Sequence, residues 1–200
     1  MIQLQTPFRM GRVEDALDMA KLVNYAGEGI PLYSWQKMAG PGENGWDVGR
    51  RRAERDTGAF SYRNAYIVEV DGACAGCLIG YAQPEVPEPI DYASMPPMFV
   101  PLQELENLAP DSWYVNVLAI FPDYRRRGLG GKLLELAGRI GAEARKSSMS
   151  VIVSDANDGA RRLYESCGYS EIASRPMVKE DWENEGENWI LLVRKLNDMV

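Results

Sequence analysis

The chain has 200 residues, of which 46% are hydrophobic and 26% charged, as expected for one soluble globular domain. Its formal net charge is −7, which argues against a general nucleic-acid binder, because such proteins gain most of their affinity by neutralising phosphates. It contains no histidine, which excludes Ser-His and Cys-His nucleophile arrangements and histidine metal sites.

The start of the chain and its cysteines indicate a cytoplasmic protein. The opening sequence MIQLQTPFRMGR lacks the long apolar core and small-residue cleavage site of a secretory signal. No apolar run approaches the roughly 20 residues that a membrane-spanning helix needs. Three cysteines, an odd number, do not indicate a disulfide framework. We therefore expect a single domain over residues 1–200 with no membrane partner.

The first part of the chain predicts a strand and two helices. Residues 2–8 alternate weakly and predict a strand. Residues 12–26 repeat apolar side chains at helical spacing and predict an amphipathic helix. Gly and Pro interrupt residues 27–47, after which a short helix is expected at 48–55.

A β-hairpin is predicted at residues 65–82, where two apolar runs flank an Asp71-Gly72 turn. Cys74 and Cys77 lie in its second strand, where residues three apart point to opposite faces, so neither a disulfide nor a shared metal site is expected. The segment at about 84–102 holds six prolines. It is predicted to be an irregular functional loop or insertion.

The second half alternates predicted strands and helices around one sheet, an α+β or α/β class. In chain order these are a strand at 112–121, a helix at 128–146, a strand at 148–155 and a helix at 157–168. This last helix has a cap signal at Asn157 and a stop signal at Gly168. Strands at 169–178 and 188–196 follow, separated by an acidic loop at 179–187.

The segment DYRRRGLGGKLLELAG (123–138) lies between a predicted strand and a predicted helix. The start of a helix offers unpaired N–H groups and the positive end of its dipole, and glycines let a phosphate approach closely. Neither the Walker loop nor the dinucleotide fingerprint fits, because Leu133 stands where a Ser/Thr or a third glycine is required. The segment therefore predicts a site for a small anionic ligand of another kind.

Two motifs resemble those of the GNAT superfamily of N-acetyltransferases. Arg125, Gly128 and Gly130 match the acyl-CoA-binding pattern [R/Q]-x-x-G-x-[G/A] within VLAIFPDYRRRGLGGKLL. Downstream, NDGARRLYESCGY resembles the pattern N-x-x-A-x-x-[LF]-Y-x-x-x-G-[FY], with Asn157 and Tyr164 two helical turns apart on one face. The resemblance is specific over about residues 113–175.

The resemblance implies a GNAT-like mixed, mostly antiparallel sheet, splayed near its fourth strand and flanked by helices, in a single domain with a Pro-rich insertion. It implies acetyl-CoA as co-substrate and no metal. Backbone groups of Leu118 and Ile120 would bind the acetyl and pantetheine groups, Asn157 would bind the pantetheine, and Tyr164 would be the general acid. The pyrophosphate would be held by backbone N–H groups and arginine side chains of the loop: Arg125, Arg126, Arg127, Gly128, Gly130 and Gly131.

By this resemblance the chain is an N-acetyltransferase in which a neutral primary amine attacks the thioester directly and the Leu118 amide stabilises the oxyanion. The general base stays open between a water relay, Glu28 and Glu69. The acidic loop, with Trp182 and Trp189, either favours a cationic acceptor by electrostatics and cation–π contact or is a solvated acidic turn. No nucleic-acid partner is implied, and homodimers are common in such proteins. The alternative function is a non-catalytic acyl-CoA-binding sensor of the same fold.

Overall fold

The structure is a computed structural model that describes residues 3–196, and the chain forms two compact units. The first unit comprises the residues up to Gly80 together with Val117–Leu133, and the second comprises Tyr81–Asn116 and the residues from Leu134 onward. None of the helices in the described part of the chain has both the length and the apolar character needed to cross a bilayer.

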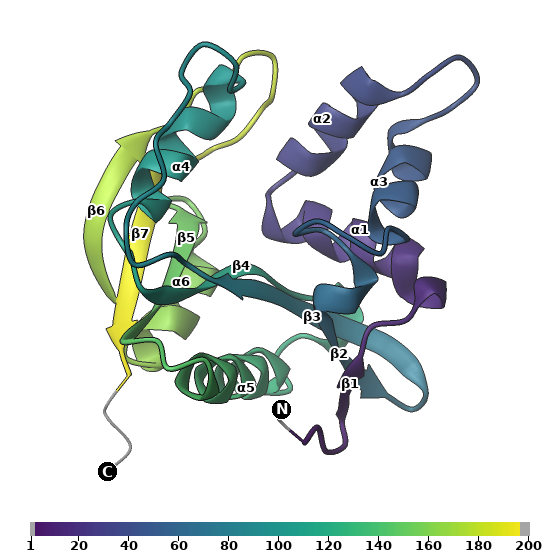
Figure 1. Ribbon diagram of the computed structural model, residues 1–200. Coiled ribbons are helices and arrows are strands. Elements are labelled where there is room, and N and C mark those ends of the chain that lie inside the picture. Colours follow the sequence, from purple (N-terminus) through teal and green to yellow (C-terminus); the bar gives the residue numbers. More distant parts are fainter. Residues whose placement is uncertain (1–2, 197–200) are drawn as a thin grey trace. The chain divides into compact units, whose positions relative to one another are not determined.

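The described residues contain a seven-stranded sheet in the order β1-β2-β3-β4-β5-β7-β6 (Figure 1). Strands β4 and β5 are parallel, whereas the β1–β2, β2–β3, β5–β7 and β6–β7 pairs are antiparallel. This arrangement confirms the predicted α+β class and the mixed, mostly antiparallel sheet. The strands are β1 (Phe8–Met10), β2 (Ala65–Val70), β3 (Ala73–Ala82), β4 (Ser112–Ile120), β5 (Ser148–Ser154), β6 (Ser170–Pro176) and β7 (Asn188–Lys195).

The helix predicted at 12–26 is present as a 3-10 turn, η1 (Val13–Asp15), followed by α1 (Ala16–Ala26). Its buried face includes Met19 and Leu22, which pack on the core side of β2 and β3. Val13 is 45% exposed because the tighter 3-10 turn places it out of phase with the α-helical stripe that begins at Ala16.

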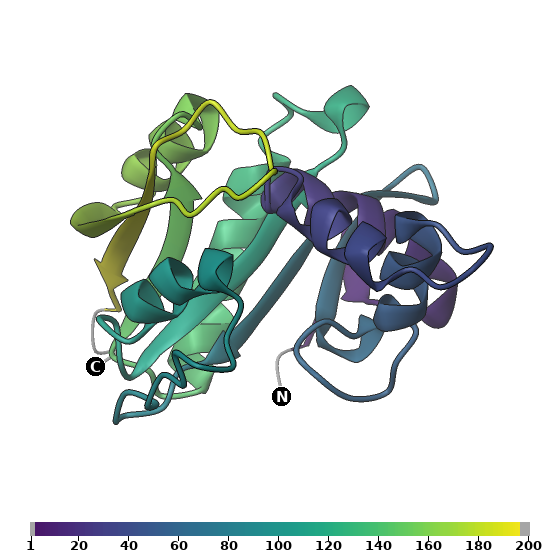
Figure 2. The same ribbon diagram turned by 90° about the horizontal axis from the view of Figure 1, so that it is seen from above.

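Helix α2 (Ile30–Met38) was not predicted, because its glycines and proline indicated an interrupted segment. Pro31 stands in the first turn, where its missing N–H costs no helical hydrogen bond. Trp35 anchors the helix by packing with Val48 and by stacking on Phe60, with ring centroids 5.7 Å apart. Figures 1 and 2 show α2 beside α1 and α3.

Helix α3 (Gly45–Ala53) begins three residues before its predicted start at residue 48. The Asn44 side chain accepts hydrogen bonds from the N–H groups of Trp46 and Asp47. In return, the Asp47 carboxylate accepts from the Asn44 N–H at 3.1 Å, which completes a capping box. A short 3-10 turn, η2 (Tyr62–Asn64), then leads into β2.

The predicted hairpin is confirmed, with Asp71 and Gly72 both in the left-handed region at φ 51° and 78°. The expectation that Cys74 and Cys77 point to opposite faces of the sheet is wrong. A bulge shifts the register, so that Val68 pairs with Gly76 and Glu69 with Cys74. The bulge interrupts the alternation of side chains, and Cys74 and Cys77 pack on the same core cluster as free thiols.

Strand β1 begins at Phe8, whereas a strand was predicted over residues 2–8; residues 3–7 form no strand, and Ile2 lies outside the described residues. Its central side chain, Arg9, donates from Nη1 and Nη2 to the Asp15 carboxylate at 2.7 and 2.9 Å. Arg9 Nε also donates to Glu69 Oε2 at 2.5 Å. These bonds tie the start of α1 to the β1–β2 edge of the first unit.

We expect this network to make stability acid-sensitive. Burial alone would raise the pKa of Asp15, but hydrogen bonds from Arg9 and from the Arg12 N–H hold it below its usual value. A depressed pKa stabilises the fold above the unfolded-state value, near about 3.9, and this stabilisation is lost as pH falls through the folded-state pKa. Thermal unfolding between pH 6 and 2.5 should therefore show a steeper loss for the wild type than for Asp15→Asn. Parallel curves would contradict the assignment.

In the second unit, α4 (Val100–Glu106) corrects the prediction that the whole Pro-rich segment is irregular. A 3-10 turn, η3 (Pro97–Phe99), precedes it, and Pro101 occupies its first turn, where proline is tolerated. Residues 84–96 form neither helix nor strand. Helix α4 packs over β5, β6 and β7 (Figure 1).

The remaining elements follow the predictions closely. Helix α5 (Leu129–Glu143) and helix α6 (Asp158–Ser166) follow β4 and β5 in the chain. Helix α6 is capped by Asn157 and followed by Gly168 at φ 85°, as its sequence predicted. In this unit, β4 pairs with β5 from Ser112–Ser148 to Val115–Val151. The next residue of β4, Asn116, is exposed.

Candidate functional site

The loop between β4 and α5, in the first unit, presents backbone N–H groups. A 3-10 turn, η4 (Pro122–Tyr124), ends β4, and Arg126 and Gly128 then take left-handed φ values of 59° and 75°. The first helical hydrogen bond of α5 runs from the Lys132 N–H to the Gly128 carbonyl at 3.2 Å. The N–H groups of residues 129–131 precede that bond, so they have no partner within the helix. This is the arrangement by which helix N-termini bind anions.

The three adjacent arginines have different surroundings. Arg125 Nε donates to the Ile120 carbonyl at 3.0 Å, which ties the loop to the end of β4. Arg127 Nη2 donates to the Asp123 carbonyl at 2.9 Å. The Arg126 side chain is exposed and has no hydrogen-bonding or ionic partner among the described residues. Arg126 is therefore the arginine of the three that is most available to a bound anion.

The end of β4 carries the two residues predicted to bind the acyl group. Leu118 and Ile120 are half-buried, and they alternate with Val117 and Ala119, which face the core. The Ile120 carbonyl already accepts from Arg125, so this backbone group is occupied in the free protein. Gly76 allows β3 to approach here, because a Cβ at this position would lie 2.5 Å from the Ala119 carbonyl oxygen.

Helix α6, in the second unit, carries Asn157 and Tyr164. Asn157 Oδ1 accepts from the Ala160 N–H at 3.1 Å, so part of its predicted ligand-binding capacity serves as the helix cap. Tyr164 is 5% exposed, and within residues 3–196 its hydroxyl forms no hydrogen bond. Burial raises the pKa of Tyr164, with smaller contributions from Tyr169 and Cys167, so the phenol is fully protonated at neutral pH.

Tyr169 lies beside Tyr164, with ring centroids 5.7 Å apart, and the prediction did not single it out. Its hydroxyl is buried without a partner among the described residues, and burial raises its pKa to about 12. Arg194 lies over the Tyr169 ring, with Cζ 5.3 Å from the ring centroid. Two tyrosines thus share a dry environment at the end of α6.

A half-buried carboxylate near β3 and β4 was also missed. Glu106 Oε2 accepts from Gln83 Nε2 at 2.8 Å and from the Tyr81 hydroxyl at 3.1 Å. The Tyr81 ring meets the Tyr114 ring edge-on at 5.4 Å. No sequence signal marked Glu106, because it follows the Pro-rich segment that was predicted to be irregular.

The carboxylates considered as bases have different roles in the first unit. Glu69 is paired with Arg9, whose Nε donates to Glu69 Oε2, so this oxygen is occupied. Glu28 stands between α1 and α2 with a left-handed φ of 52°. Among residues 3–196, no group of three His, Cys, Asp or Glu side chains is placed to hold a metal ion.

The tryptophans of the acidic loop do not offer open ring faces for a cation. Trp182 and Trp189 are 6% and 5% exposed, and their rings stack on each other with centroids 6.0 Å apart. Asp155 anchors the same loop by accepting from the N–H groups of Glu187 and Asn188 at 2.9 and 3.0 Å. The expected cation–π contact with an acceptor is therefore wrong for this pair.

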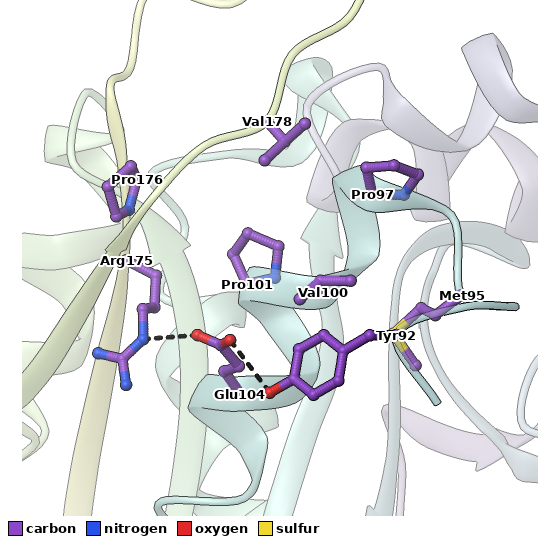
Figure 3. Close-up of a pocket in the computed structure, with 9 residues that line it drawn as sticks. All are labelled: Tyr92, Met95, Pro97, Val100, Pro101, Glu104, Arg175, Pro176 and Val178. Carbon is purple, nitrogen blue, oxygen red and sulfur yellow. Dashed lines mark hydrogen bonds and ion pairs between the residues drawn. The ribbon is translucent and has the colours of Figure 1, made fainter. Parts of the chain in front are cut away.

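A pocket of about 320 Å³ lies between the Pro-rich segment, α4 and β6, all within the second unit (Figure 3). Its walls are mainly apolar and include three prolines. Its two charged residues pair with each other, since Arg175 Nε donates to Glu104 Oε2 at 2.8 Å, and Tyr92 donates to Glu104 at 3.5 Å. The pocket thus provides apolar surface, while its charges are already satisfied.

Comparisons with known proteins agree with these features. A family model described as the acetyltransferase (GNAT) family matches residues 31–169, more than half of the chain. No curated protein sequence matches. A solved acetyltransferase structure is 18% identical with a TM-score of 0.64, covering 94% of this chain and 98% of that one.

Two further solved structures share the fold. An N-acetyltransferase from Staphylococcus aureus Mu50 is 22% identical with a TM-score of 0.64, covering 94% of this chain and 99% of that one. A Bacillus subtilis acetyltransferase in complex with CoA is 13% identical with a TM-score of 0.50, covering 82% and 91%. The family model covers both motifs, and the structure has a strand, a loop and a helix over residues 112–143 and a tyrosine on α6. The chain therefore belongs to the acetyltransferase (GNAT) family.

Proposed function

We propose that the protein transfers the acetyl group of acetyl-CoA to a primary amine, on a small molecule or a protein. The observation that carries this proposal is the loop between β4 and α5, where left-handed Arg126 and Gly128 precede first-turn N–H groups that lack helical partners. Such a loop suits the pyrophosphate of coenzyme A, and a complex of the Bacillus subtilis relative contains CoA.

In this proposal the loop N–H groups bind the pyrophosphate, together with the side chain of Arg126. The backbone N–H groups of Leu118 and Ile120 bind the acetyl and pantetheine groups, and the Asn157 side chain contributes to pantetheine binding. Arg125 and Arg127 already donate to the Ile120 and Asp123 carbonyls, so their main role is to hold the loop in shape.

Tyr164 is proposed to protonate the departing thiolate. Its raised pKa keeps the proton in place until negative charge develops on sulfur, and the same dry surroundings strengthen the attraction between that charge and the phenol. The amine nitrogen forms the C–N bond, the C–S bond breaks, and the thiolate takes the phenolic proton. The proton lost by the new amide nitrogen then restores the phenol.

The domain organisation is proposed as one GNAT domain over residues 1–200. Strand β4 and helix α5 each begin in one compact unit and end in the other, which supports one domain over two independent ones. A cytoplasmic location and a homodimer are proposed on the family alone.

Binding of acetyl-CoA is tested first by thermal unfolding with acetyl-CoA, free CoA or ATP at millimolar concentration. A ligand at a hundred times its Kd adds about 2.7 kcal/mol, and a domain of this size should then melt about 5–10 °C higher. We expect both coenzymes to raise the melting temperature and ATP to have little effect. No shift with either coenzyme would contradict the binding half of the proposal.

Acetyl transfer is tested by CoA release from acetyl-CoA in the presence of a panel of primary amines. A protein that binds acetyl-CoA and acetylates none of them fits the alternative of an acyl-CoA sensor. Acetylation of at least one amine, dependent on Tyr164, supports the enzyme.

A further inference from the structure

The proposed transfer needs a group that takes a proton from the acceptor, because a protonated ammonium has no free electron pair with which to attack. Sequence reasoning left this base open between water, Glu28 and Glu69. In the second unit, Glu106 at the end of α4 has the surroundings that such a group needs.

One oxygen of the Glu106 carboxylate is fixed and the other is open. Oε2 accepts from the Gln83 side-chain amide and from the Tyr81 hydroxyl, both on or next to β3. Among the described residues, Oε1 accepts no hydrogen bond, and no Lys or Arg pairs with Glu106. Its neighbour on the same helix, Glu104, is by contrast paired with Arg175. Glu106 is therefore held in place but not neutralised.

Among the described residues, the groups that interact with Glu106 carry no positive charge. They are Tyr81 and Gln83 from β3 and its end, Glu88 from the Pro-rich segment, and Tyr114 from β4. Burial raises the pKa of Glu106 above its ordinary value, the bonds from Gln83 and Tyr81 oppose this, and the charge of Glu88 adds to it. A half-buried carboxylate among such neighbours attracts a cation and accepts a proton more readily than a solvated glutamate.

Tyr114 is a β4 residue next to this carboxylate arrangement. The Tyr81 hydroxyl donates to Glu106, and the Tyr81 ring meets the Tyr114 ring edge-on at 5.4 Å. The pKa of the buried Tyr114 is raised by burial and then by electrostatic interactions with Glu106, Tyr81 and Tyr164. The carboxylate and the phenol that the reaction needs thus both interact electrostatically with one β4 residue in this unit.

We propose that Glu106 binds the ammonium group of the acceptor and is the general base of acetyl transfer. This rests on the proposed function. The Glu106 carboxylate takes one proton from R–NH3+, leaving R–NH2 to attack the thioester carbon, and later releases that proton to solvent. The thiolate leaves with the proton of Tyr164, and the phenol recovers one from the amide nitrogen. The net reaction yields the acetamide, free CoA and one proton.

The competing account makes Glu106 an anchor that joins α4 to β3. The two accounts share their effect on stability and differ in their effect on catalysis. Because its folded-state pKa is raised, Glu106 costs stability in either account as pH rises above about 4.5, where the unfolded chain loses this proton first. Glu106→Gln removes that cost, so its melting temperature at pH 7.5 should equal or exceed that of the wild type.

The test measures CoA release against pH with spermidine and with a peptide that has a free α-amine and a lysine. Glu106→Gln should lower kcat about 10²–10⁴-fold and remove the acidic limb of the kcat/KM profile. Its Kd for acetyl-CoA should stay within twofold of the wild type. Glu104→Gln, two residues away on the same helix, is the matched control and should keep both kcat and the acidic limb.

An exposed residue provides a second variant that cannot fail through misfolding of the core. Glu88→Gln removes a negative charge near Glu106 and should move the acidic limb to lower pH with kcat unchanged at its plateau. If Glu106→Gln retains kcat within threefold and the limb stays in place, Glu106 is an anchor and the proposal is wrong. If the wild type acetylates no amine of the full panel although acetyl-CoA binds, the proposed function itself fails.

Discussion

Replacing Tyr164 by Phe should lower kcat by about 10²–10⁴-fold and leave acetyl-CoA binding nearly unchanged. Tyr164 is 5% exposed and its hydroxyl makes no hydrogen bond within residues 3–196, so removing the hydroxyl breaks no hydrogen bond of the free protein. The ring, which packs on Tyr169, is retained. A loss that falls on kcat at constant Kd is expected only if the hydroxyl acts after the coenzyme has bound. Steady-state rates of CoA release and calorimetric binding of acetyl-CoA measure the two quantities.

Tyr169→Phe is the matched control. It removes the neighbouring hydroxyl, which is also buried and has no partner among the described residues. Deleting an unsatisfied buried polar group should leave stability unchanged or raise it. We expect full activity from Tyr169→Phe and a melting temperature at or above that of the wild type. Equal losses in both variants would mean that the tyrosine pair serves packing, and full activity of Tyr164→Phe would exclude it as the acid.

The sequence was sufficient where a local pattern determines local structure. The Asp71-Gly72 turn, the strand predicted at 112–121 and the Asn157 cap of α6 each depend on residues within one element, and each is confirmed. Helices α2 and α4 were missed because their prolines indicated irregular segments. Each helix places its proline in the first turn, where the ring is tolerated, and buries an anchor, Trp35 or Leu105, whose partners lie elsewhere in the chain.

The difference between local and long-range determinants also applies to the candidate site. Residues of the two motifs could be named from the sequence because their spacing is local. The surroundings of Glu106 could not be predicted, because its partners Tyr81 and Gln83 are separated from it by more than twenty residues of Pro-rich sequence. Likewise, Trp182 and Trp189 looked available to a cation in sequence, but they stack on each other once the acidic loop folds back to Asp155.

Gly131→Ala should stabilise the free protein and weaken its binding of acetyl-CoA. A Cβ at Gly131 would meet no atom within 4 Å, and alanine in a helix is favoured over glycine by about 0.5–1 kcal/mol. The free protein thus has neither a steric nor an energetic reason for glycine at this position in the first turn of α5. A pyrophosphate held by the N–H groups of that turn would supply one, because it needs the space that a methyl group would fill. We expect a melting temperature about 1–4 °C higher and a Kd for acetyl-CoA at least about tenfold weaker, a loss of about 1.4 kcal/mol.

Gly159→Ala, in the first turn of α6, separates the two effects. A Cβ there would meet only Asn157 Oδ1, at 3.9 Å, so the same gain in helix stability is expected without a change in coenzyme affinity. Thermal unfolding and titration with acetyl-CoA on both variants give the comparison. If Gly131→Ala binds acetyl-CoA as tightly as Gly159→Ala does, the pyrophosphate does not lie against the first turn of α5. The anion held by the arginine–glycine loop must then be sought on the Arg126 side, where the guanidinium is exposed.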